Sequence, residues 1–284
     1  MTTTTSTALA TDDVPGVLVK TSVGDVHVVF DGDVHAAVVV ACVHGLPGSA
    51  RDFIHLGREL RRRGACAVRF DMPGFGRSPP LKMAPSSTLY APQQRAAVVA
   101  EVMQRLGHRR YAVVGHSFGG TAALATAASF EAVTALALIC SVGVTRHRGL
   151  TIPHEITRQL AGIRELPVVG ARLAAPFIDV VRQTTERLGV RGERPFSDDE
   201  IVDQMQLLGG IDYADLRGFA RRVRVPALVM SAEDDRILER AVPFTLAAAL
   251  TSSPLVTHHH RTTGGHFLQK RAAAAIADWL TVVG

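Results

Sequence analysis

A serine between two glycines is the residue of this chain best suited to nucleophilic chemistry. The pattern G-x-S-x-G is centred on Ser117, with Gly115 and Gly119 on either side, and joins an apolar run at 111–115 to an alanine-rich stretch at 117–130. Where a strand turns sharply into a helix, side chains at the glycine positions would collide with neighbouring backbone, and the central residue is strained and exposed. The helix N-terminus stabilises an anion that develops nearby. We therefore predict that Ser117 is a nucleophile, with an ordinary helix-capping serine as the alternative.

The nucleophile needs a base within hydrogen-bond distance, because a serine hydroxyl alone reacts poorly. The chain has 12 histidines that could supply it. Three of them, at 258–260, are consecutive, but on a strand they alternate between faces and cannot all bind one metal ion. No carboxylate beside them has the spacing of a metal motif. The cysteines Cys42, Cys66 and Cys140 are expected to be reduced and buried. We predict neither a metal site nor a cofactor.

The elements that must position these residues alternate along the chain. Apolar or alternating runs predict strands at 26–30, 36–43, 66–70, 111–115, 135–140, 227–231 and 255–258. Helical spacing predicts helices at 51–63, 92–106, 117–130, 239–250 and 267–282. This β-α order predicts an α/β fold with a mostly parallel sheet and helices on both faces.

The alternation breaks after Ser141, where no strand pattern occurs until about residue 220. Helical patterns lie near 153–163, 170–188, 198–208 and 212–220, and Ser197 with Glu200 has the spacing of a capping box. An insertion of this length is too long for an ordinary loop. We therefore predict a flexible N-terminal tail at 1–22, an α/β core at 23–142 and 221–284, and an all-helical cap at 143–220, folding as one unit.

Length, composition and charge restrict the class of protein. The chain has 284 residues, of which 47% are apolar and 20% charged, so it is expected to fold. No apolar run reaches the roughly 18 residues that cross a bilayer, and the Thr-rich N-terminus lacks a secretory pattern, so we predict a cytoplasmic protein without membrane contact.

The net charge is +5, but the arginine groups at 61–63, 109–110 and 221–224 fall at helix ends or before strands. Those positions lie opposite the edge where ligands bind, and no recognition motif indicates a nucleic-acid partner.

Four motifs together resemble the α/β-hydrolase fold superfamily, in particular its capped branch of serine hydrolases. The first is His44-Gly45-Leu46-Pro47-Gly48, the second runs from Asp71 to Ser78, the third surrounds Ser117, and the fourth is Gly264-Gly265-His266-Phe267. The resemblance covers the chain from about residue 24 to its end. It is specific for the superfamily and only weakly specific for any one activity.

The resemblance implies a catalytic set in the chain order serine, acid, histidine. His266 occupies the position of the base, on a loop before the last helix. The acid follows the strand at 227–231, where the resemblance favours Asp235, with its neighbour Asp234 as the main alternative and Glu233 as the third. No carboxylate follows the strand at 135–140, where some relatives carry the acid.

The resemblance also implies a site for the oxyanion. The backbone N–H of Phe118, directly after the nucleophile, is one donor, and the resemblance assigns Leu46 as the other. Gly115 and Gly119, described above, shape the turn, while His44 and Gly45 are expected to support the neighbouring loop rather than transfer protons.

The implied function is hydrolysis of a small-molecule ester, amide or related carbonyl bond by a serine hydrolase, most simply a carboxylic-ester hydrolase (esterase). A C–C bond hydrolase of diketone-type substrates, a cofactor-free peroxidase and a slow ligand receptor on the same fold remain alternatives. Epoxide hydrolases and haloalkane dehalogenases use an aspartate where this chain has Ser117. Because no cluster of Arg or Lys stands out on the cap, we expect a moderately apolar acyl pocket.

Overall fold

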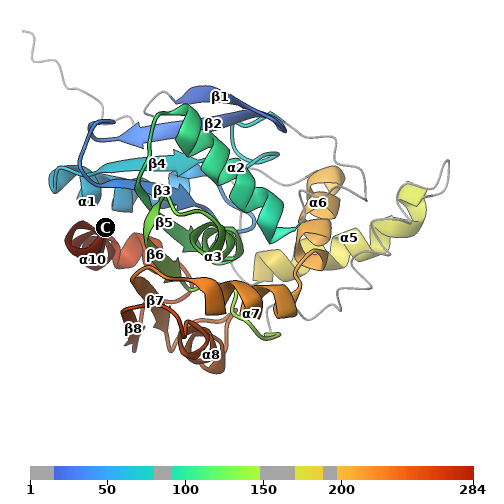
Figure 1. Cartoon of the computed structure of the whole chain (residues 1–284). Helices are drawn as coiled ribbons and strands as arrows, with labels where there is room; N and C mark the ends of the chain where they lie inside the picture. The colour runs from blue at the N-terminus through green and yellow to red at the C-terminus, as the bar shows by residue number, and fades with distance from the viewer. Residues whose placement is uncertain (1–15, 80–90, 148–169, 188–196) are drawn as a thin grey trace, which may run out of the picture.

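A single eight-stranded sheet forms the centre of the molecule (Figure 1). The computed structural model describes residues 16–79, 91–147, 170–187 and 197–284. The strand order is β1-β2-β4-β3-β5-β6-β7-β8, and only the β1–β2 and β2–β4 pairs are antiparallel. The strands are β1 (Val17–Thr21), β2 (Gly24–Asp31), β3 (Val39–Val43), β4 (Cys66–Phe70), β5 (Tyr111–His116), β6 (Val133–Ile139), β7 (Ala227–Ala232) and β8 (Val256–Arg261). The mostly parallel sheet predicted from the β-α order is confirmed.

Helices cover both faces of this sheet (Figure 1). One face carries α1 (Ile54–Arg62), α9 (Leu268–Arg271) and α10 (Ala273–Val283), which contact one another. The other carries α2 (Pro92–Arg105) and α3 (Gly119–Ser129), with α8 (Ala241–Ala249) beside β7 and β8. A short 3₁₀ helix, η1 (Ala50–Phe53), precedes α1.

The continuous apolar run of β3 shows why the sheet is covered on both faces. Val39, Ala41 and Val43 belong to the core under α2 and α3. Val40 and Cys42 point the opposite way, into the core under α1 and α10. Since alternate side chains of a strand face opposite sides, a strand buried on both faces must be apolar at every position.

Three helices occupy part of the interval between β6 and β7 for which the sequence predicts a cap. They are α5 (Gly170–Arg187), α6 (Asp198–Gly209) and α7 (Tyr213–Arg222). The capping box at the start of α6 is present: Ser197 Oγ accepts from the Glu200 N–H at 3.3 Å, and the Glu200 carboxylate accepts from the Ser197 N–H at 2.8 Å. α7 packs on α3, whereas α5 packs on α6 away from the sheet (Figure 1). The predicted helix near 153–163 lies outside the described residues.

The flexible tail predicted for residues 1–22 is wrong at its C-terminal end. Residues Val17 to Thr21 form β1, which a turn at residues 22–23 joins to β2, and Gly24 at the start of β2 has φ +123°. Val19 is the buried residue of this strand, and Val17 and Leu18 are exposed. An edge strand that buries one side chain in five leaves little hydrophobic pattern in the sequence. Such a strand is stabilised by its pairing with β2 and not by burial of its own side chains.

Two C-terminal boundaries also differ from the prediction. β8 continues through the histidines at 258–260 to Arg261, because β7 offers pairing partners as far as Ala232. The helix predicted at 267–282 is divided at Ala272 into α9 and α10.

Within the described part of the chain, the helices are all too short or too polar to traverse a lipid bilayer.

Candidate active site

The turn between β5 and α3 holds Ser117 at φ +51°, a conformation that side chains other than glycine adopt rarely. A Cβ at Gly115 would lie 2.5 Å from the Gly120 Cα and 2.7 Å from the Ala123 Cβ. A Cβ at Gly119 would overlap the carbonyl oxygen of Val43 on β3. The two glycines flanking Ser117 are therefore required by close backbone approach, as the sequence pattern predicts.

A chain of hydrogen bonds connects Ser117 to His266 and Asp235. Ser117 Oγ lies 2.8 Å from His266 Nε2, and His266 Nδ1 lies 2.8 Å from Asp235 Oδ2. Asp235 is 3% exposed and His266 is 8% exposed, so water screens this interaction weakly. Ser117 follows β5, Asp235 follows β7 and His266 follows β8, so parallel strands bring these distant residues to one edge of the sheet.

The two neighbouring aspartates have different partners. Asp235 contacts His266, and its other carboxylate oxygen accepts from the N–H groups of Ile237 and Leu238 at 2.8 and 3.0 Å. Burial alone would raise the pKa of the Asp235 carboxyl, but the His266 contact and these amides together hold that pKa below its usual value. Asp234 instead accepts from the N–H groups of the glycines at 264 and 265. Thus Asp235 faces the imidazole, and Asp234 holds the loop that carries it.

His116 supports the same loop from the other side. Its Nε2–H donates to the carbonyl oxygen of His266 at 2.9 Å. Burial, together with the nearby His266, lowers the pKa of His116 to about 3, so this ring stays neutral near neutral pH. The neutral ring of His116 donates one hydrogen bond to the His266 backbone. This arrangement suits a residue that positions His266, and it does not suit one that transfers protons.

Two backbone N–H groups beside Ser117 are available to bind an anion. Within the described residues, the N–H groups of Leu46 and Phe118 pair with no acceptor, and both residues line one pocket. Gly45 brings the Leu46 loop against Ser117: a Cβ at Gly45 would lie 3.1 Å from the Ser117 Cβ. The structure therefore places the two expected donors on adjoining loops at the nucleophile.

His44 connects this loop to the turn after β4. Its Nδ1–H donates to the carbonyl of Gly45 at 2.7 Å, and its Nε2 accepts from the N–H of Met72 at 3.0 Å. Burial lowers the pKa of His44, which favours the neutral ring that this bonding pattern requires. Both ring nitrogens of His44 are therefore engaged in hydrogen bonds to the backbone of the two loops.

The thiol of Cys140 is close to this site. Its Sγ, an Asp235 oxygen and a His266 nitrogen all lie within 4.8 Å of one another, a separation that could suit a metal ion. The hydrogen bond between Asp235 and His266 accounts for part of this proximity. Burial raises the pKa of the Cys140 thiol far above its usual value, and a protonated thiol is a poor metal ligand. Cys140 Sγ also lies 3.6 Å from the carbonyl of Gly265.

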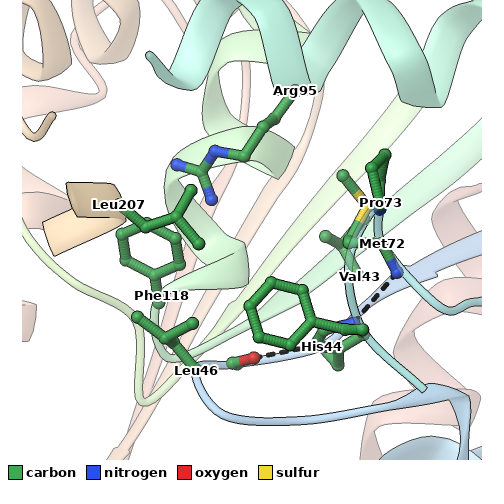
Figure 2. Close-up of a pocket in the computed structure, with 10 residues that line it drawn as sticks. Val43, His44, Leu46, Met72, Pro73, Arg95, Phe118 and Leu207 are labelled. Carbon is green, nitrogen blue, oxygen red and sulfur yellow. Dashed lines mark hydrogen bonds between the residues drawn. The ribbon is translucent and has the colours of Figure 1, made fainter. Parts of the chain in front are cut away.

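A pocket opens beside the two N–H donors (Figure 2). It holds about 420 Å³ of empty space, part of which is open to solvent. Its lining is mostly apolar, but it includes one arginine. The lining residues are Val43, His44, Gly45, Leu46, Met72, Pro73, Phe75, Arg95, Phe118 and Leu207.

Arg95 lines this pocket, but the motifs of the sequence predict no role for it. Arg95 lies one helical turn before Val98 and Val99 and two turns before Val102, all on the buried face of α2. A charged residue on the apolar stripe of an amphipathic helix is the signal that could have identified it.

All these loops follow the carboxyl ends of parallel strands. The helix that follows β3 (α1) and the helix that follows the adjacent strand β5 (α3) cover opposite faces of the sheet, so the strand order reverses between β3 and β5. Open α/β sheets bind ligands at such a switch point.

Comparison with known proteins agrees with this fold. A family model described as the alpha/beta hydrolase fold matches residues 38–168. The enol-lactonase from Burkholderia xenovorans LB400 superposes with a TM-score of 0.70 at 22% identity, covering 94% of this chain and 99% of that one. The esterase EaEST from Exiguobacterium antarcticum gives a TM-score of 0.69 at 18% identity, covering 94% and 100%.

This chain has the α/β-hydrolase fold. Among curated relatives, the hydrolase YugF of Bacillus subtilis is 28% identical over 225 residues, 76% of this chain and 80% of that protein. An Escherichia coli protein named as a proposed carbamate hydrolase, RutD, is 26% identical over 230 residues, 76% and 81% of the two chains.

Proposed function

We propose that this α/β-hydrolase is a serine hydrolase that cleaves a small-molecule ester, amide or related carbonyl bond through an acyl-enzyme. The observation that carries the proposal is the hydrogen-bond chain from Ser117 through His266 to Asp235, with Ser117 held at φ +51°. Nucleophile, base and orienting acid lie in the order that acyl transfer requires. The hydrolase names of the curated relatives support the same reaction class.

The first half-reaction acylates Ser117. As Ser117 Oγ attacks the substrate carbonyl carbon, His266 Nε2 takes the hydroxyl proton, and Asp235 stabilises the resulting imidazolium. The N–H groups of Leu46 and Phe118 bind the oxyanion of the tetrahedral intermediate, where losing one donor typically costs about 10²–10³ in turnover. When the intermediate collapses, the bond to the leaving group breaks, and His266 returns the proton to that group.

The second half-reaction releases the acid. A water molecule gives a proton to His266 and attacks the acyl carbon, and the oxyanion forms again at the same two donors. Collapse breaks the bond to Ser117 Oγ, which regains its proton from His266. The products are the carboxylic acid and the free enzyme.

We further propose that the helices between β6 and β7 cap this site. Leu207 of α6 lines the pocket together with Phe118, so one wall comes from the helical segment (Figure 2). A wall of this kind excludes water from the acyl-enzyme and strengthens the interactions that stabilise the intermediate.

Labelling with a fluorophosphonate probe tests the nucleophile. We expect the wild-type protein to be labelled and the variant Ser117→Ala to be unlabelled. The matched control is Ser129→Ala, which removes an exposed serine at the end of the same helix, α3, and should leave labelling unchanged. Equal labelling of wild type and Ser117→Ala would show that another residue reacts.

A further inference from the structure

One wall of the pocket carries a buried arginine. Arg95 is 7% exposed and reaches from α2 over the ring of Phe118, with its guanidinium carbon 4.0 Å from the ring centroid (Figure 2). Its Nη2 donates to Thr121 Oγ1 at 2.7 Å, and its Nε is buried with no hydrogen-bond partner among the described residues. Within the described residues, no carboxylate lies at ion-pair distance from Arg95.

Arg69 shows how this chain stabilises a buried guanidinium elsewhere. Arg69 is 2% exposed, and its Nε and Nη2 donate to the two carboxylate oxygens of Asp31 at 2.5 and 3.3 Å. A buried charge is normally paired with an opposite charge in this way, because an unpaired buried charge strongly destabilises the folded protein. Among the described residues, Arg95 contacts a hydroxyl and an aromatic face, and these residues offer its charge no counter-ion.

Arg95 remains charged under ordinary conditions. Burial lowers the pKa of its guanidinium to about 9, which still leaves it protonated near neutral pH. The other lining residues are apolar or neutral, since burial also lowers the pKa of His44. Among the described lining residues, Arg95 therefore supplies the positive charge, in surroundings where water screens it weakly.

The position of Arg95 connects this charge to the reaction centre. Leu46 and Phe118, the proposed oxyanion donors, line the same pocket as Arg95. Thr121, which accepts from Arg95, in turn donates to the carbonyl of Phe118 at 2.8 Å. A substrate whose reacting carbonyl binds these donors can thus extend a second group toward Arg95.

We propose that Arg95 is a specificity residue that binds a carboxylate carried by the substrate, so that the enzyme prefers esters of carboxylate-bearing molecules to neutral esters. The inference rests on the proposed hydrolase function. A planar guanidinium matches a carboxylate, and such charge-assisted pairs are about twice as strong as neutral hydrogen bonds.

Matched substrate pairs test the preference. The aryl hydrogen esters of succinic, glutaric and adipic acid carry the charge on the acyl side, and 4-carboxyphenyl acetate carries it on the leaving group. Each has a neutral amide analogue of nearly the same shape. We expect kcat/KM to favour at least one charged ester over its amide by about 10- to 100-fold, the range for a hydrogen bond to a charged group.

Two variants separate charge from packing. Arg95→Met keeps a long side chain against Phe118 and should abolish the preference, whereas Arg95→Lys should retain part of it. A residue that merely supports Phe118 would lower kcat for charged and neutral esters alike. The proposal would be overturned if Arg95→Met lowered kcat/KM equally for both members of every pair. It would also be overturned if the wild-type ratio of kcat/KM for the charged ester to that for its amide were near one in every pair.

A binding measurement distinguishes failure of this inference from failure of the proposed function. Glutarate should raise the melting temperature of Ser117→Ala more than glutaramide does, and Arg95→Met in the same background should remove the difference. This difference in melting temperature is expected whether or not the fluorophosphonate labels Ser117 of the wild-type protein. If the labelling succeeds but glutarate and glutaramide act alike, the hydrolase proposal stands and the role of Arg95 is refuted.

Discussion

At the scale of the residue, two adjacent carboxylates show how neighbours in the chain acquire different environments. Asp235 is buried and faces His266, while Asp234 binds the N–H groups of the His266 loop. Sequence spacing and resemblance favoured Asp235 without excluding Asp234. The choice depends on which side chain the turn after β7 directs at the imidazole, and only the fold contains that information.

Replacing each aspartate separately tests this difference. Asp235→Asn should lower kcat by about 10⁴, because an amide permits the wrong imidazole tautomer and cannot stabilise the imidazolium. Asp234→Asn is the matched control and should cost far less, since its amide oxygen can still accept from the loop. Ester turnover with circular dichroism to verify folding is the measurement. A larger loss for Asp234→Asn would reverse the assignment.

At the scale of the element, the turn from β5 into α3 is determined by local sterics. Gly115 approaches the backbone of α3 so closely that only a glycine fits there. The sequence records this requirement as a glycine at a fixed spacing from Ser117. β1 is the opposite case, because its residues Val17 to Thr21 form a strand through pairing with β2 and bury little of their own surface.

Gly115→Ala tests the steric requirement at this turn. The new methyl group would lie 2.5 Å from the Gly120 Cα, which is backbone and cannot move aside as a side chain could. We expect the free energy of unfolding to fall by about 1–3 kcal/mol, the usual cost of overpacking. Urea denaturation at equilibrium measures it.

Gly218→Ala provides the control for this substitution. Gly218 lies within α7, and the nearest atom to its added Cβ would be the flexible Nη1 of Arg222 at 3.3 Å. The same change there should be neutral or stabilise by about 0.4–1 kcal/mol, because alanine restricts the unfolded chain. If both variants are equally destabilised, the steric account of the β5–α3 turn is wrong.

At the scale of the whole molecule, the helical segment and the sheet share a core. Leu207 of α6 and Leu216 and Phe219 of α7 belong to the same buried cluster as the strands and α3. α5 is different, because its buried residues Ala174 and Ile178 pack in a small separate cluster with α6. We therefore expect α6, α7 and the sheet to unfold together.

Thermal unfolding followed by two probes tests this coupling. Trp279, the one tryptophan, lies on α10 and donates to Thr257 of β8 at 3.2 Å, so its fluorescence reports on the sheet. Far-ultraviolet circular dichroism reports on all helices. Coincident transitions are expected for one cooperative unit. A loss of helical signal well below the fluorescence transition, larger than α5 could account for, would show a cap that unfolds independently.

The sequence alone determined the features that depend on short-range sterics and periodicity. The glycines around Ser117, the β-α order of the core and the capping box of Ser197 with Glu200 are all local requirements, so they appear as residue types at fixed spacing. The resemblance to the α/β-hydrolase fold rests on four short motifs of the same local kind, and the fold class is confirmed.

Only the tertiary structure decided which distant groups meet. Ser117 and His266 are 149 residues apart, and the parallel strands, not their spacing, bring Ser117 Oγ within 2.8 Å of His266 Nε2. The charge of Arg95 is one of many in the sequence. It becomes significant because α2 and α3 bury it beside Phe118, and no carboxylate of the described residues lies at ion-pair distance from it. Burial and long-range contact arise from packing the whole chain, so no local pattern records them.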